Sequence, residues 1–329
     1  MKEPLVRLYW RILYGADIAR AALMRVRDLS EEAVVVIGSP RSGTTWLMRL
    51  IAERPDYCAL FEPLHTRWWP AARGSGFGDR PSEGDDRMRQ YMRRVLNGTV
   101  ASRRPRWSPR IEGDVKRLIP GMVQRMWADC LVIKFVRAVR LLPWMVEHFP
   151  QQRYIYVARN PYAVVSSQLR TGITGYGDSD LLDKVRQSDR MLTRFYDRIR
   201  TDAEQVLDGT VEDRFESVEE CLALSWYADN IVAQQIADHE AVLAVKYENL
   251  LQTRDAERRR IQNHIGAAVR PREEGNVRNP QSQLTKWSRH LSGAQVERIR
   301  NALRILERAH GPVEVAPLPD RHTESPPQS

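Results

Sequence analysis

The segment Val34–Leu47 limits the possible folds of this 329-residue chain more than any other. Its first four residues, Val34–Ile37, are apolar and mostly β-branched, and they lead directly into the loop Gly38–Gly43. An amphipathic stretch, Trp46–Ile51, follows the loop. A strand, a glycine loop and a helix in that order form an anion site, because backbone N–H groups and the helix N-terminus converge on the anion. The segment therefore predicts an α/β fold with a phosphate-binding loop.

This loop departs from the nucleoside-triphosphate loop of kinases and NTPases. Gly38 and Gly43 have the Walker A spacing, but that motif requires Lys and then Ser or Thr after the second glycine, and Thr44 stands in place of the lysine. The cation lies inside the loop instead, at Arg41. The loop thus predicts phosphate binding without the γ-phosphate lysine. A P-loop kinase or NTPase remains the alternative, as does a nucleotide-binding adaptor without catalysis.

Four more short apolar runs alternate with helical patterns along the chain: Tyr57–Phe61, Leu131–Val136, Tyr154–Ala158 and Ala241–Val245. Such runs are typical of strands that are covered on both faces. The alternation predicts an α/β fold with a P-loop-type central parallel sheet flanked by helices. Capping boxes at Ser217–Glu220 and Ser292–Gln295 predict two later helix starts.

We expect one main domain, residues 31–311, preceded by an amphipathic helix in residues 1–30 and followed by a disordered tail in residues 312–329. Two long insertions, residues 65–129 and 171–217, interrupt the strand and helix pattern. The N-terminal helix is basic and is expected to pack on its own domain, with contact to a membrane surface as the alternative.

Composition excludes several classes of protein. The net charge of +9 suits an anionic ligand, but the basic residues are nearly all Arg and show no aromatic platform or zinc-finger pattern, so no nucleic-acid partner is expected. Cys58, Cys130 and Cys221 are scattered, which argues against disulfides and a zinc site. No apolar run is long enough to span a bilayer and no signal segment is apparent, so we expect a cytoplasmic protein, with membrane association through the N-terminal helix as the alternative.

Charged residues follow or interrupt the predicted strands. Arg159 ends the fourth strand, at the edge where open α/β sheets bind ligands. Glu62 follows the second strand and is a candidate general base, with His65 as its competitor. Lys134 lies within an apolar run, which is costly unless the lysine is paired or functional.

The motif Pro40-Arg41-Ser42-Gly43-Thr44-Thr45-Trp46 resembles the loop that binds the 5′-phosphosulfate in sulfotransferases using 3′-phosphoadenosine-5′-phosphosulfate (PAPS). Arg159, followed eight residues later by Ser167, resembles the 3′-phosphate site of that family, where Ser166 could assist. The resemblance implies transfer of a sulfuryl group from PAPS by in-line displacement, without a metal. It assigns the 5′-phosphosulfate to six residues, Arg41, Ser42, Gly43, Thr44, Thr45 and Trp46.

Other segments extend this resemblance. Phe61-Glu62-Pro63-Leu64 is similar to a segment of Golgi-type carbohydrate sulfotransferases, which implies that Glu62 is the base and that the acceptor is a hydroxyl of a carbohydrate or glycolipid. Lys134 would then assist at the transferred group together with Arg41. The resemblance also implies that Tyr247 borders the adenine and that Lys286 or Arg289 contacts the 3′-phosphate. Trp226 and Asn230 resemble a Trp/Asn pair of the family. The two insertions would form the acceptor side of the site.

Overall fold

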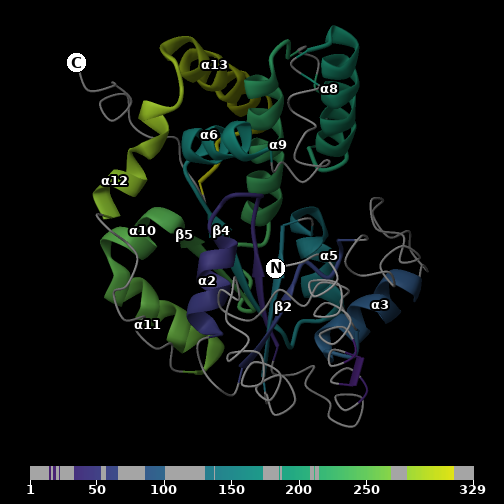
Figure 1. Cartoon of the computed structure of the whole chain (residues 1–329). Helices are drawn as coiled ribbons and strands as arrows, with labels where there is room; N and C mark the ends of the chain where they lie inside the picture. Colours follow the sequence, from purple (N-terminus) through teal and green to yellow (C-terminus); the bar gives the residue numbers. More distant parts are fainter. Residues whose placement is uncertain are drawn as a thin grey trace, which may run out of the picture. The chain divides into compact units, whose positions relative to one another are not determined.

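A five-stranded sheet forms the centre of the protein. The computed structural model describes residues 15, 18–19, 22, 33–52, 57–65, 86–100, 130–136, 138–172, 185, 187–207, 211, 215–267 and 280–314. The strand order is β2-β3-β1-β4-β5, and β3 pairs in parallel with both β1 and β2. The strands are β1 (Val34–Ile37), β2 (Tyr57–Phe61), β3 (Cys130–Phe135), β4 (Arg153–Ala158) and β5 (Val242–Lys246). Each lies within one residue of its predicted bounds, and the predicted α/β fold with a central parallel sheet is confirmed (Figure 1).

The chain divides into two compact units. The first contains Met1–Ile37, Thr44–Ile155 and Ile261–Glu273. Its helices are α2 (Thr44–Ile51), α3 (Asp86–Leu96), the 3-10 helix η3 (Val139–Leu141) and α5 (Leu142–His148). The aliphatic side chains of α2 and its methionine are buried, and this helix packs against β1, β2 and β3. The helix begins at Thr44, directly after the loop, and it contains the amphipathic stretch Trp46–Ile51 that the sequence indicated.

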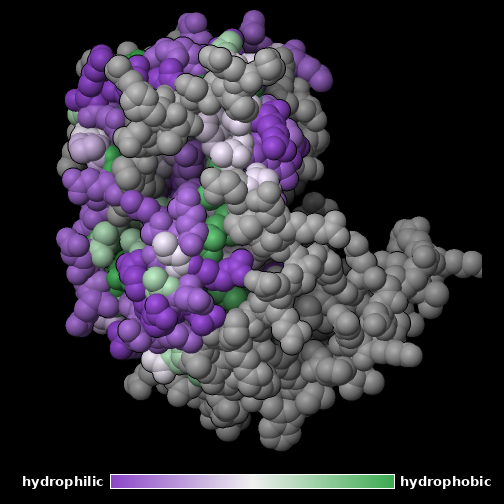
Figure 2. Space-filling model, turned by 90° about the vertical axis from the view of Figure 1, so that its left-hand side faces the viewer, coloured by the Kyte–Doolittle hydropathy of each residue, from purple (hydrophilic) through white to green (hydrophobic). Residues whose placement is uncertain are grey.

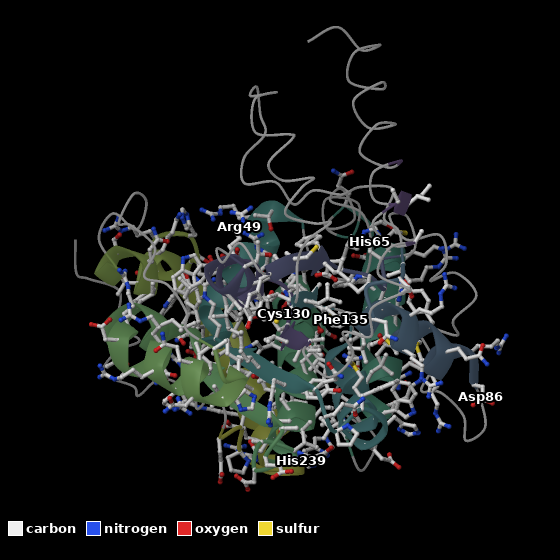
Figure 3. All side chains as sticks on the ribbon, turned by 90° about the horizontal axis from the view of Figure 1, so that it is seen from below. Arg49, His65, Asp86, Cys130, Phe135 and His239 are labelled. Atoms are coloured by element: carbon white, nitrogen blue, oxygen red, sulfur yellow. The ribbon has the colours of Figure 1, made fainter. Side chains whose placement is uncertain are left out.

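Helix α3 belongs to the first insertion and has two distinct faces. Its apolar side chains are buried, whereas its arginines are exposed. The buried Tyr91 hydroxyl donates a hydrogen bond to the carbonyl of Pro63, which ties α3 to the turn that follows β2. In Figure 3, Asp86 marks the outer start of α3, away from Cys130 and Phe135 at the two ends of β3. The insertion therefore supports the segment that carries Glu62.

The second unit contains Gly38–Gly43, Tyr156–Arg260 and Glu274–Ser329. Helix α9 (Val218–Gln234) is buried on most sides because it packs against α6 (Pro161–Thr171), α8 (Asp189–Glu204) and α13 (Gly293–His310) (Figure 1). The remaining helices are α10 (Tyr247–Gln252), α11 (Arg254–Ile265), whose last turn belongs to the first unit, α12 (Pro280–Leu284) and the 3-10 helix η4 (Lys286–Arg289). Both predicted capping boxes are confirmed, at the starts of α9 and α13.

Several predictions fall on segments that the structure does not describe. They concern most of residues 1–30, most of the tail from residue 315 onward, and the remainder of both insertions. Among the described residues, no helix has the length and apolar character needed to cross a membrane. On the face drawn in Figure 2, the described side chains are mainly hydrophilic, with small separate groups of hydrophobic ones.

Candidate functional site

The loop between β1 and α2 has a strained backbone. Arg41 adopts a φ of 76° and Gly43 a φ of 102°, both in the left-handed region. The Ser42 N–H donates to the carbonyl of Ser39 at 3.1 Å and closes a turn. A Cβ on Gly43 would lie 2.3 Å from Cδ2 of Tyr247, so the position requires glycine for its φ and for this close approach. Gly43, the second glycine of the predicted loop, therefore lies where the loop backbone contacts the ring of Tyr247.

Helix α6 holds this loop from the side of β4. The Nε of Arg41 donates to Oγ of Ser167 at 3.0 Å, and the Nε2 of Gln168 donates to the carbonyl of Pro40 at 3.1 Å. The helix itself starts at a defined place, because the Asn160 side chain accepts a hydrogen bond from the N–H of Ala163 at 3.2 Å. Two consecutive residues of α6 thus fix the side chain and the backbone of the loop. Sequence reasoning missed the role of Gln168, which no motif indicates.

Arg159 joins the same cluster from the end of β4. Its Nη1 donates to the carbonyl of Arg41 at 2.9 Å, and its guanidinium lies 4.3 Å from the ring centroid of Tyr247. The Nε1 of Trp226 donates to the Arg159 carbonyl at 2.9 Å and fixes the backbone there. The structure therefore brings together Arg41, Ser167, Arg159 and Tyr247, which the sequence predicted as donor-binding residues from three separate segments.

The cluster has an excess of positive charge. Burial lowers the pKa of Arg41, and repulsion from Arg159 and Arg170 lowers it further. Burial also lowers the pKa of Arg159, while Tyr247 and Glu248 partly offset this effect. Glu248 is itself engaged, since its Oε1 accepts from the N–H of Asn160 at 3.1 Å.

Two buried polar atoms in and beside this cluster have no hydrogen-bond partner within the described residues. In the part of the chain that the structure describes, Oγ of Ser42 and Nε of Arg159 are buried without a hydrogen-bond partner. Buried polar atoms without partners are rare in native proteins and call for an explanation. Two desolvated guanidinium groups and an unpaired hydroxyl at a strained turn fit a phosphate ligand, which would supply both the negative charge and the hydrogen-bond acceptors.

A second cluster lies at the ends of β2 and β3 in the first unit. Glu62 and Lys134 form an ion pair between Oε1 and Nζ, and they are only 3% and 4% exposed. The other carboxylate oxygen, Oε2, accepts from the N–H of Val136 at 3.2 Å. Lys134 also lies 4.5 Å from the ring centroid of Phe61. The base and the cation that the sequence proposed separately are thus direct partners, and their individual roles stay predictions.

The backbone geometry explains this pairing. Phe61 is the register partner of Lys134, and the Glu62 N–H donates to the carbonyl of Lys134 at 2.9 Å. Glu62 has a φ of 50°, which turns the chain sharply at the end of β2, and the His65 N–H closes this turn on the Glu62 carbonyl at 2.9 Å. The sequence signal for this pair was a lysine inside one apolar strand and a carboxylate directly after another strand.

The other predicted residues occupy less central places. Thr44, Thr45 and Trp46 form the first turn of α2. Lys286 and Arg289 are exposed on η4, which is anchored by the ring of Trp287 stacked on Tyr162 at 4.9 Å. Ser166 is buried in α6. Within the described ranges, no three His, Cys, Asp or Glu side chains come together as metal ligands would.

A parallel α/β sheet whose first strand leads into a cation-bearing loop and a helix N-terminus is an arrangement that suits an anionic ligand at the strand ends. Residues 33–218, more than half of the chain, match the model of the sulfotransferase family, and the chain belongs to that family. No curated protein matches the sequence significantly.

Three solved structures that the chain resembles are sulfotransferases or sulfotransferase domains. A sulfotransferase domain from the curacin biosynthetic pathway shares 16% identity, over 87% of this chain and 98% of that chain, with a TM-score of 0.43. A sulfotransferase domain from the olefin synthase of Synechococcus PCC 7002 shares 15% identity, over 82% of this chain and 93% of that chain, with a TM-score of 0.42. Sulfotransferase STF9 from Mycobacterium avium shares 14% identity, over 91% of this chain and 80% of that chain, with a TM-score of 0.41.

Proposed function

We propose that this sulfotransferase uses PAPS as its donor and transfers the sulfuryl group to a hydroxyl of a carbohydrate. The observation that carries the proposal is the cluster of Arg41, Arg159 and Ser167, with two guanidinium groups whose pKa values burial lowers. A donor with a phosphate at the 3′ position and a phosphosulfate at the 5′ position has the charge that such a cluster lacks. Family membership supports the same reaction class.

In this proposal the donor is recognised at its two anionic ends. Arg159 and Ser167 bind the 3′-phosphate, and Arg41 with Ser42 binds the 5′-phosphosulfate, whose leaving oxygen gains negative charge during transfer. Fixed donors aimed at such developing charge stabilise a transition state without reorganisation. The anchors on the loop, Gln168 at Pro40 and Arg159 at the carbonyl of Arg41, supply that fixity.

Glu62 and Lys134 are proposed to handle the acceptor and the transferred group. The acceptor oxygen attacks sulfur, the bond from sulfur to the bridging phosphate oxygen breaks, and the acceptor proton passes to Glu62. Lys134 balances the carboxylate before transfer, because the two side chains form a buried ion pair. It stays beside Glu62 as a cation while the carboxylate takes up the proton, and it is then available to the transferred anionic group.

The acceptor class is the finer part of the proposal. It rests on the likeness of Phe61-Glu62-Pro63-Leu64 to carbohydrate sulfotransferases, and it extends to a glycolipid as the form in which the carbohydrate is presented. Incubation with sulfur-35-labelled PAPS and separate mono- and oligosaccharide acceptors tests it directly. Labelled sulfate on a sugar hydroxyl supports the proposal. Transfer of the label only to phenols or amines would contradict a carbohydrate acceptor.

Donor recognition has its own test in Arg159→Ala. Removing a charge-assisted contact costs about 2 kcal/mol, or roughly thirtyfold in affinity. We expect that loss for adenosine 3′,5′-bisphosphate and a much smaller one for adenosine 5′-phosphate, measured by calorimetry. Arg153→Ala, which removes an exposed arginine from the start of β4, is the matched control. A variant Arg159→Ala that keeps the full preference for the bisphosphate would refute the assignment.

A further inference from the structure

Helix α3, in the first insertion, has a strongly basic exposed side. Its eleven residues include one acidic side chain, Asp86, at the helix start. They also include four exposed arginines, Arg87, Arg89, Arg93 and Arg94. The apolar side chains of this helix are buried, so its exposed side offers charge rather than apolar surface. Arginines with this exposure suit a partner that carries negative charge.

A hydrogen bond ties this helix to the turn that follows β2. The buried hydroxyl of Tyr91 donates to the carbonyl of Pro63, the residue directly after Glu62. The same turn is closed by the His65 N–H, which donates to the carbonyl of Glu62 at 2.9 Å. All of these residues belong to the first unit. The side of α3 that carries Tyr91 therefore lies against the segment that positions the proposed base.

Two of the arginines share the Tyr91 side of the helix. Residues three and four positions apart are neighbours on a helix surface. Arg94 is three residues after Tyr91, and Arg87 is four residues before it. Burial raises the pKa of Tyr91, and the charge of Arg94 opposes this rise, so Arg94 lies within electrostatic reach of the hydroxyl. The backbone of Arg94 is also fixed, because its carbonyl accepts from the N–H of Thr99 at 2.9 Å and from the Thr99 hydroxyl at 3.1 Å.

The other two arginines lie on a different side of α3. Successive helix residues are turned by about 100°, so Arg93 leaves the helix in another direction than Arg94, and it follows Arg89 by four positions. Arg89 already has a negative neighbour, since its Nη1 lies 3.7 Å from Oδ1 of Asp86. Arg93 and Arg94 both belong to the last turn, where any cation is favourable to the helix dipole. What distinguishes Arg94 from Arg93 is its place beside the Glu62 turn.

We propose that Arg94, assisted by Arg87, forms a subsite for an anionic group on the acceptor. In the proposed function, on which this inference rests, Glu62 takes the proton of the attacking hydroxyl. An acceptor that brings negative charge close to this carboxylate needs a cation beyond Lys134, whose charge Glu62 already offsets. The preferred acceptor is therefore an acidic sugar, with a carboxylate or an ester sulfate near the reacting hydroxyl. The buried apolar side of α3 favours such a sugar over a lipid surface, into which an interfacial helix inserts apolar side chains.

Sulfate transfer from sulfur-35-labelled PAPS to three forms of one disaccharide tests the subsite. The forms are the neutral disaccharide, its counterpart with a uronic acid and its counterpart with one ester sulfate. We expect the wild-type chain to favour at least one acidic form, which identifies the anion, and this preference should weaken as salt screens the exposed arginine. Arg94→Gln should raise KM for the favoured acidic form about fivefold, with kcat and the reaction of the neutral form unchanged.

Neighbouring variants supply the controls. Arg93→Gln removes the same charge one residue away and should keep the preference, and Arg94→Lys keeps the charge and should retain most of it. Arg93→Gln and Arg94→Gln should unfold at the same urea concentration, because each removes one cation from the last turn of α3. A difference between these two variants in KM alone therefore reports on the acceptor and not on the stability of the helix.

The outcomes separate this inference from the proposed function. If the wild-type chain sulfates none of the three sugars, the proposed function fails and the inference fails with it. If the chain sulfates the neutral and acidic forms equally well, or if Arg93→Gln and Arg94→Gln weaken the acidic form equally, the subsite alone is refuted. If Arg94→Gln keeps the preference but weakens binding to phosphatidylserine vesicles, the basic side of α3 faces a membrane and the subsite is refuted as well.

Discussion

Arg41 and Glu62 hold strained backbone conformations. Among the residues that the structure describes, they are the two with a side chain whose φ is positive, at 76° and 50°. Such conformations cost on the order of 1–3 kcal/mol each and persist only where the surroundings enforce them. Glu62 directly follows β2 and Arg41 lies in the loop after β1, and both were chosen from the sequence as catalytic candidates. Strain at these two positions is what a preorganised site would show, and it arises independently of any motif.

Gly43→Ala tests the conformation of the loop. The new Cβ would lie 2.3 Å from Cδ2 of Tyr247, in a residue whose φ of 102° alanine disfavours, so the loop or the ring must move. We expect the free energy of unfolding to fall by about 1–3 kcal/mol and the affinity for adenosine 3′,5′-bisphosphate to fall with it. Calorimetry and urea unfolding measure the two effects. Gly293→Ala, where a Cβ meets no atom within 4 Å, is the control and should change neither. If Gly43→Ala leaves the affinity for adenosine 3′,5′-bisphosphate unchanged, donor binding does not depend on the conformation of this loop.

The Glu62–Lys134 pair allows its chemical role to be separated from its structural one. Glu62→Gln or Lys134→Met alone leaves a buried charge without its partner, which costs about 3–5 kcal/mol. The double variant removes both charges and should recover much of that stability. Sulfate transfer should be lost in all three variants, because each lacks the proposed base, the proposed cation or both. A stable double variant that still transfers sulfate would show that the pair is only structural.

Two hydrogen bonds join helix α9 to β4 and to the residue that follows it, and a third lies within α9. Trp226 donates to the carbonyl of Arg159, Tyr156 donates to Oδ1 of Asn230 at 3.1 Å, and Nδ2 of Asn230 donates to the carbonyl of Trp226 at 2.7 Å. The pair on this helix thus supports the backbone from which the Arg159 side chain extends. The sequence resemblance named this pair without indicating what it does.

Trp226→Phe tests this support at the level of the helix. Phenylalanine keeps most of the apolar contact but removes the N–H that binds the Arg159 carbonyl, at a cost of about 1–3 kcal/mol for the unpaired group. Affinity for adenosine 3′,5′-bisphosphate should drop several-fold because Arg159 is less well fixed. Trp144→Phe on α5, whose ring stacks on His148, is the matched control and should leave the affinity as it is. Equal effects of the two variants would mean that α9 does not position Arg159.

Local sequence patterns were sufficient for the elements but not for the contacts between them. Short apolar runs placed all five strands within one residue, and the caps at Ser217 and Ser292 placed two helix starts, because these signals are local. Helices α3 and α8 were not predicted, since their buried residues alternate with many charged ones. The contact of Tyr247 with Gly43 and Arg159 depends on packing between distant segments, which no spacing in the sequence encodes.

The distribution of buried ionisable groups sets the behaviour of the whole molecule at high pH. Burial raises the pKa of several tyrosines above the ordinary value of 10.0, among them Tyr91, Tyr154, Tyr156 and Tyr227. Burial likewise raises the pKa of the Cys221 thiol from 9.0 to about 12. All five groups are neutral when protonated, so the native state keeps these protons at a pH where the unfolded chain has lost them.

The sign of the effect follows from proton linkage. Above pH 9.0 for the thiol and pH 10.0 for the phenols, the unfolded state binds fewer protons than the native state, and the free energy of unfolding falls as pH rises. Each such group contributes a slope of about 1.4 kcal/mol per pH unit between its unfolded and folded pKa values. The stability from these groups is therefore complete below pH 9.0 and is lost progressively above it, with the thiol contributing first.

Urea unfolding at a series of pH values checks this prediction, with tyrosinate absorbance followed in the same samples. The unfolding midpoint should be insensitive to these five groups below pH 9.0 and should fall ever more steeply above pH 10.0, with the absorbance of the buried phenols rising only as the chain unfolds. Cys221→Ala should remove the earliest part of the decline, whereas Cys130→Ala, at a half-buried position, should not. If all tyrosines titrate near pH 10.0 while the chain stays folded, the phenols are accessible to solvent and this account of its alkaline limit is wrong.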